Sequence, residues 1–181
     1  MEKRTVAVEE KQGLKNTRNL ILVGVMMAVG VVLRLFAGVI AVGNMHPNFL
    51  IATYCLSIYV IRPNIAESAI IGLISGAISQ IGTSMAWLGL GSETLGAISM
   101  CLLLFIPLPK LLKPVICTFV ATLISGFAFV GLAAITYANP MPGAQFISMS
   151  LVTLVTALLN MVIVTVLAIP VNKVLGIGKE A

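Results

Sequence analysis

The feature that most constrains this chain is a set of long, continuous apolar segments. They cover residues 19–42, 48–61, 65–84, 94–106, 115–137 and 146–171. Only 9% of the residues are charged, whereas about a quarter are charged in a typical soluble domain. Such a chain cannot keep a water-facing surface soluble, so we expect an integral membrane protein. Because the runs are continuously apolar and do not alternate, they predict helices rather than barrel strands.

The expected fold is therefore an all-α bundle of six transmembrane helices. Residues 1–18 form a polar leader, 19–175 a single six-helix domain, and 176–181 a tail. The second and fourth segments are short for a bilayer core of about 30 Å. We expect them to be tilted, extended by their flanks, or partly sheltered by neighbouring helices.

The distribution of basic residues predicts the orientation. With six spans, the N-tail, the turn at 62–64, the loop at 107–114 and the C-tail share one face, and every lysine and arginine except Arg34 falls there. Cytoplasmic loops are enriched in lysine and arginine. We therefore expect a multi-pass plasma-membrane protein with both termini in the cytoplasm.

Several classes of function are disfavoured by what the sequence lacks. It has one histidine and no aspartate, and Cys55, Cys101 and Cys117 are scattered through apolar segments, so no metal site is expected. No HExxH or GxxxxGK[ST] motif occurs, which disfavours a metalloprotease or an ATPase. We expect neither enzymatic activity nor a cofactor. The net charge of +5 reflects the basic residues that orient a membrane protein and does not indicate nucleic-acid binding.

Polar side chains gather in the outer half of the predicted bundle. Besides Arg34, the candidate ligand-binding residues are Asn44, His46, Asn48, Gln80, Trp87, Glu93, Thr94, Tyr137 and Asn139, with Asn160 deeper in the last span. At roughly 1.5 Å per residue, Arg34 lies about 24 Å beyond Arg18. It either extends to the outer headgroups or faces the interior, where it contacts Glu93 or a ligand carboxylate.

The other candidates have alternative roles as well. Glu93 is expected at the start of the fourth helix, where the helix dipole favours an acid, or it receives an ammonium group. Trp87 is an interfacial anchor or a lid, and His46 is a solvated loop residue or a ligand contact. Asn160 bonds another helix or a ligand.

Small residues mark two helices. Gly24 and Ala28 in the first span, and Gly72 and Gly76 in the third, permit close helix approach. The face on the first span suits internal packing or docking onto another membrane protein.

Three stretches carry a resemblance to a known family. The segments "GNMHPNFLIA", "IIGLISGAISQIGTS" and "VTALLNMVIVTVLAIPV" resemble the tryptophan-type substrate-binding S components of energy-coupling-factor (ECF) transporters. The resemblance covers residues 19–175. Asparagine stands at position 48, where that family more often has aspartate, and the "GLGSET" loop also departs from its pattern.

The resemblance implies a subunit that captures a vitamin or amino acid, with tryptophan favoured. A separate transmembrane coupling protein and two cytoplasmic ATPases would drive transport. Arg34 would meet the carboxylate, and either Glu93 or asparagine and glutamine side chains would meet the ammonium. The indole would contact aromatic side chains: Phe49, Tyr54, Trp87 and Tyr137. The alternatives are an S component for another small acid or vitamin such as pantothenate, bound through Arg34 and His46, and a membrane assembly or structural partner.

Overall fold

The structure is a computed structural model that describes residues 13–37, 46–81, 83, 85, 87–109, 112–136 and 141–175. Within these ranges the secondary structure is entirely helical, as the sequence predicts. The helices are α1 (Thr17–Ala37), α2 (Leu50–Ile61), α3 (Ile65–Ile78), α4 (Leu88–Leu103), α5 (Lys113–Thr136) and α6 (Gly143–Leu175).

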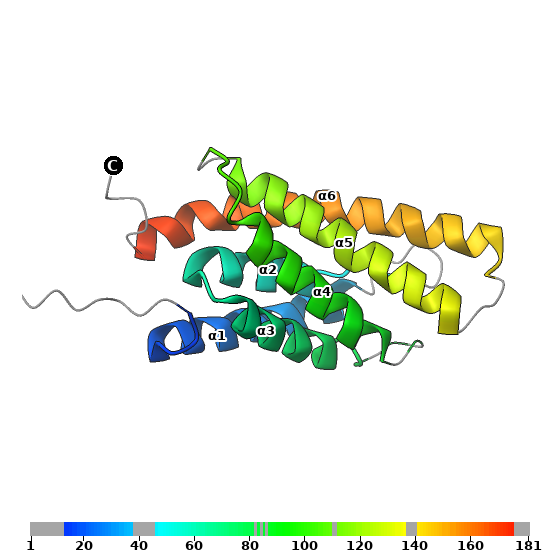
Figure 1. The fold of residues 1–181 in the computed structure, drawn as a ribbon, viewed down its shortest axis with the longest axis horizontal. Helices are drawn as coiled ribbons and strands as arrows, with labels where there is room; N and C mark the ends of the chain where they lie inside the picture. Colours follow the sequence, from blue (N-terminus) through cyan, green and yellow to red (C-terminus); the bar gives the residue numbers. More distant parts are fainter. Residues whose placement is uncertain are drawn as a thin grey trace, which may run out of the picture.

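The helices form a bundle around α2. Figure 1 shows α5 and α6 side by side along one side of the molecule and α1 with α3 along the other. Helix α4 lies next to α3 and α5, and α2 contacts each of the other five helices. Consecutive helices alternate in direction, so α1, α3 and α5 end where α2, α4 and α6 begin.

Helix α2 explains how a short apolar segment fits this fold. It has only 12 residues, about 18 Å of helix, and every side chain from Leu50 to Ile58 is buried. The expectation that a short segment is sheltered by its neighbours is confirmed for α2. Its mostly apolar sequence reflects contact with protein on all sides.

The outside of the bundle is apolar. On α1, Ile21, Leu35 and Phe36 are exposed by 62%, 68% and 66%, and α6 presents a similar row. Three helices are long and apolar enough to cross a membrane: Thr17–Ala37, Lys113–Thr136 and Gly143–Val171. An apolar exterior around an interior containing buried serine, threonine and asparagine side chains is the arrangement expected of a membrane-embedded protein.

Glycines allow α3 and α4 to lie in close contact. A Cβ at Gly72 would lie 2.6 Å from Thr94 Cα, and one at Gly76 would lie 2.6 Å from Leu90 Cα. Hydrophobic burial does not hold helices together in lipid, so close van der Waals contact matters more there. The expected close approach at Gly72 and Gly76 is confirmed. Gly24 differs, since nothing lies within 4 Å of a Cβ added there.

The start of α4 differs from the sequence-based prediction. The helix begins at Leu88, not at residue 94, so the glycine-rich stretch before Glu93 is helical rather than a loop. Glycine is a poor helix former, which is why a loop was predicted. Here the missing side chain has a packing role, because a Cβ at Gly89 would overlap the Ser79 hydroxyl.

The opposite end of the bundle is organised by Glu67. Asn64 and Glu67 form a reciprocal cap at the start of α3, with Glu67 N donating to Asn64 Oδ1 over 2.8 Å. The same carboxylate accepts a hydrogen bond of 3.2 Å from Leu14 N. Glu67 thereby attaches the segment before α1 to the α2–α3 turn.

Candidate functional site

A large cavity lies inside the bundle at the end where α1 and α3 finish. Its volume is about 1070 Å³, and residues from all six helices or their immediate ends line it. The charged and amide side chains on its wall are Arg34, Asn48, Glu93 and Gln145, and His46 joins them at the rim. Four of these five residues are among the candidate ligand-binding residues named from the sequence. The fifth, Gln145, belongs to the same predicted outer half but was not named as a candidate.

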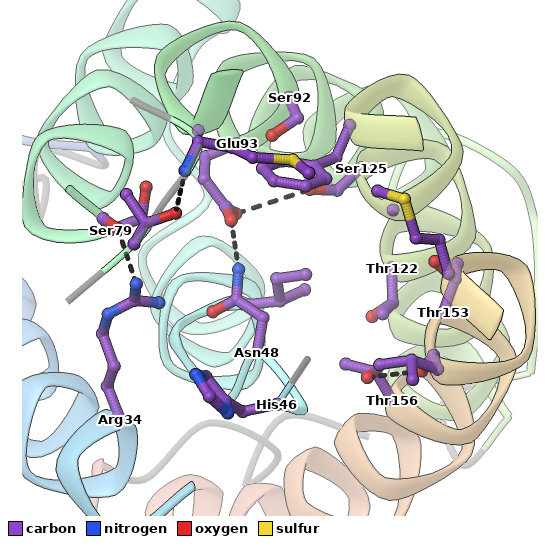
Figure 2. Close-up of a pocket in the computed structure, with 18 of the residues that line it drawn as sticks. Arg34, His46, Asn48, Ser79, Ser92, Glu93, Thr122, Ser125, Thr153 and Thr156 are labelled. Atoms are coloured by element: carbon purple, nitrogen blue, oxygen red, sulfur yellow. Dashed lines mark hydrogen bonds between the residues drawn. The ribbon is translucent and has the colours of Figure 1, made fainter. Parts of the chain in front are cut away.

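Glu93 is the acidic group of this wall. It lies in the second turn of α4 and is only 2% exposed. The prediction that it begins the helix is therefore wrong, because α4 extends back to Leu88. Asn48 Nδ2 donates a hydrogen bond to Glu93 Oε1, and Ser125 Oγ lies 3.5 Å from Glu93 Oε2 (Figure 2). Three elements thus converge on one carboxylate.

Asn48 is held in turn by Asn160 from the middle of α6. Asn160 Nδ2 donates to the Asn48 carbonyl over 3.0 Å, and Asn160 is fully buried. Asn48 Oδ1 accepts a hydrogen bond of 3.2 Å from Leu50 N. Asn160 is not on the cavity wall. Its contact is to another part of the protein, and it orients Asn48, which then orients Glu93.

Arg34 reaches across to the end of α3. Its Nη2 donates to the Ser79 carbonyl over 2.6 Å, and its Nε donates to the Ile81 carbonyl over 3.0 Å (Figure 2). Carbonyls at a helix C-terminus lack helical partners and carry partial negative charge. In the part of the chain that the structure describes, the guanidinium forms these bonds rather than an ion pair with Glu93.

The sequence analysis missed the hydroxyl groups on the far wall. They are Thr122 and Ser125 on α5, and Ser148, Thr153 and Thr156 on α6. Figure 2 shows Thr122, Thr153 and Thr156 across the opening from Asn48 and Glu93. A signal was present, because residues 118, 122 and 125, like residues 153, 156 and 160, are polar at helical spacing.

Several predicted contacts lie away from the cavity. Trp87 is 73% exposed, and its backbone N–H donates to Gln80 Oε1 over 2.7 Å, so both residues shape the α3–α4 turn. Thr94 donates to the Leu90 carbonyl over 2.6 Å within α4. Phe49 and Tyr54 are buried in the bundle and are not on the wall.

Apolar contact with a ligand would come from other residues. Phe129 supplies an aromatic ring to the wall, and Met85 and Met149 supply flexible thioethers. Asn44, Tyr137 and Asn139 lie outside the described residues. Gly24 and Ala28 are exposed on α1, away from the cavity.

The described residues contain no group of three or more histidine, cysteine, aspartate or glutamate side chains that could hold a metal ion.

Comparison with known proteins finds no matching family model, curated protein or solved structure. The functional argument therefore rests on the cavity and its chemistry.

Proposed function

We propose that this chain is the membrane-embedded substrate-binding subunit of an importer of the energy-coupling-factor type. It captures a small organic nutrient, with tryptophan favoured, in the cavity bounded by Glu93 and the α5–α6 hydroxyls. The chain binds its ligand and does not itself supply energy for transport.

The observation that carries the proposal is a large cavity with polar groups on its wall, inside a bundle whose exterior is apolar. Ligand pockets typically have volumes of about 300–1,000 Å³, and this cavity has about 1070 Å³. Buried polar groups are costly in a membrane protein and mark ligand pathways or sites. Glu93, Asn48 and the hydroxyl-bearing wall are such groups, and they come from different helices.

Six spans with both termini in the cytoplasm follow from the same proposal. Helices α2, α3 and α4 have 12, 14 and 16 residues, so each is shorter than a bilayer core of about 30 Å. Contact with the longer helices supports their place in the bundle. In this orientation the basic residues Lys15, Arg18, Arg62 and Lys113 face the cytoplasm, and the cavity opens to the outside.

A transport cycle would require partners. The sequence has no phosphate-binding GxxxxGK[ST] motif, so a transmembrane coupling protein and two cytoplasmic ATPases would supply the energy. Exposed Gly24 and Ala28 on α1 suit docking of the coupling protein, because no described residue lies within 4 Å of a Cβ added at Gly24. Gly24→Leu would then reduce transport in the full complex and leave ligand binding unchanged.

Reconstitution of the purified chain alone tests the proposal. Proteoliposomes containing it should bind radiolabelled L-tryptophan saturably, and they should not accumulate it when ATP is supplied inside or outside. Accumulation against a gradient by this chain alone would contradict the assignment as a binding subunit. Empty liposomes and liposomes containing an unrelated six-helix protein provide the background.

A further inference from the structure

The two sides of the cavity differ in the hydrogen-bonding groups that they offer. Thr122 Oγ1 donates to the Thr118 carbonyl over 2.8 Å, and Thr156 Oγ1 donates to the Val152 carbonyl over 2.7 Å. Ser148 Oγ does the same toward the Gln145 carbonyl over 2.9 Å. A carbonyl only accepts, so each hydroxyl has used its hydrogen and keeps lone pairs for another partner.

Glu93, across the opening from these hydroxyls, is a further acceptor and carries negative charge. It is 2% exposed, and among the described residues Arg34 attracts it electrostatically but forms no ion pair with it. Asn48 and Ser125 provide hydrogen bonds to Glu93 but no charge. A buried carboxylate without an ion-pair partner is costly, so a positively charged ligand group would stabilise this site.

The donor-rich side is already engaged. Arg34 is the cation on the cavity wall that would attract a carboxylate, but its Nε and Nη2 hold the Ile81 and Ser79 carbonyls. Figure 2 shows Arg34 beside α3, across the opening from Thr122 and Thr156. Binding a carboxylate bidentately through Nε and Nη2 would require release of the end of α3.

We propose that the cavity selects its ligand by a primary ammonium group and does not require a carboxylate. The ammonium donates to the Glu93 carboxylate. The hydroxyl oxygens of Thr122 and Thr156, across the opening, accept hydrogen bonds from other N–H groups of the ligand, such as the indole N–H of tryptamine. The rest of the ligand lies toward Phe129 and Met149. This inference rests on the proposed ligand-binding function and narrows the substrate class to amines, including amines that are not amino acids.

Matched probes test this selectivity in detergent-solubilised full-length protein by calorimetry. The probes are tryptamine and indole-3-propionate, then phenethylamine and 3-phenylpropionate, with L-tryptophan as the reference. The two amines should bind with dissociation constants within about 10-fold of L-tryptophan, and the two acids should show no saturable binding. Glu93→Gln should weaken tryptamine binding by at least about 30-fold.

Substitutions of single hydroxyls separate the site from the fold. Thr156→Val should weaken tryptamine binding by about 10-fold. Thr165→Val is the matched control, because Thr165 makes the same kind of bond on α6, to the Met161 carbonyl over 2.6 Å, and is not on the cavity wall. If Glu93→Gln does not fold, the comparison of Thr156→Val with Thr165→Val still shows whether the cavity wall binds the amine.

Three results would overturn the proposal: binding of the acids in preference to the amines, absence of binding by both amines, or tryptamine binding unaffected by Glu93→Gln and Thr156→Val. If L-tryptophan binds and tryptamine does not, the proposed selection by an ammonium group is wrong while the proposed binding function stands. If the amines bind but the reconstituted chain accumulates ligand by itself, selection by an ammonium group stands and the assignment as a binding subunit is wrong.

Discussion

At the scale of single residues, Arg34 shows how a charge in an apolar helix is accommodated. Its position near the outer end of the first helix could be predicted from the spacing to Arg18. Its partners could not be, because the Ser79 and Ile81 carbonyls are backbone groups whose exposure depends on where α3 ends. The sequence analysis considered headgroups, Glu93 or a ligand, and the structure instead has a helix-terminus contact.

Arg34→Ala should therefore lower stability. Hydrogen bonds to charged groups contribute about 1.5–3 kcal/mol each, and the end of α3 would lose two. Arg34→Lys keeps the charge without the planar guanidinium, so its stability should lie between those of wild type and Arg34→Ala. Thermal unfolding of the three proteins in detergent measures this order of stability. An Arg34→Ala protein as stable as wild type that no longer binds ligand would show that Arg34 is a ligand contact instead.

Asn160 acts on the site through Asn48. Asn160→Ala should leave the partly buried Asn48 carbonyl without its partner, at a cost of about 1–3 kcal/mol in unfolding free energy. Ligand affinity should fall too, because Asn48 then holds Glu93 less firmly. Denaturant unfolding and calorimetry on the same preparation give both quantities. Unchanged affinity in a destabilised variant would restrict Asn160 to a structural role.

The hydroxyls of α5 and α6 are where the sequence analysis was least complete. Serine and threonine inside apolar helices commonly bond their own backbone, so a single one carries little information. Their repetition at positions 122 and 125 and at 153 and 156 was the usable signal. That the two rows lie on the same side of the cavity depends on the pairing of α5 with α6, which no local pattern specifies.

At the scale of helices, existence and order could be predicted, and two boundaries were misplaced. Helix α3 ends at Ile78 rather than at residue 84, and α4 begins at Leu88 rather than at residue 94. Apolar runs determine where helices can lie, so all six predicted segments overlap observed helices. The start of α4 was misplaced because the glycine content before Glu93 favours a loop by propensity. Close packing of Gly89 on Ser79 is a tertiary contact that overrides this propensity.

Glycine substitutions test the packing of α3 on α4. Gly76→Ala should destabilise the protein by about 1–3 kcal/mol, because the added Cβ would lie 2.6 Å from Leu90 Cα and α4 would have to move. Gly131→Ala is the matched control, since nothing lies within 4 Å of a Cβ there. It should be neutral or stabilising by up to about 1 kcal/mol. Equal effects at the two positions, measured by thermal unfolding, would show that the α3–α4 contact is looser than described.

At the scale of the whole molecule, membrane character follows from composition, and the proposed orientation rests on where the basic residues lie. The apolar exterior and the three long helices agree with a membrane-embedded protein. Orientation relative to the two sides of the membrane remains part of the proposal. The cavity was the least predictable feature, because its wall is formed by side chains from six helices that meet only after folding.

Cysteine labelling tests the proposed orientation. In a background with Cys55, Cys101 and Cys117 replaced by alanine, single cysteines are introduced as Gln145→Cys or Pro109→Cys. A membrane-impermeant maleimide applied to intact cells should label the first variant. It should label the second only after permeabilisation. The reverse pattern would place the cavity opening in the cytoplasm and contradict the proposed import.

The central claim is that the cavity around Glu93 holds a small nutrient, and native mass spectrometry tests it most directly. Wild-type protein is incubated with the low-molecular-mass fraction of yeast extract, supplemented with L-tryptophan, and sprayed from detergent. The account predicts a one-to-one complex with a molecule of low mass in wild type and in Glu67→Gln, whose altered carboxylate is at the other end of the bundle. It predicts strong loss of that complex in Glu93→Gln. A wild-type protein that retains nothing, or a complex equally abundant in Glu93→Gln, would contradict it.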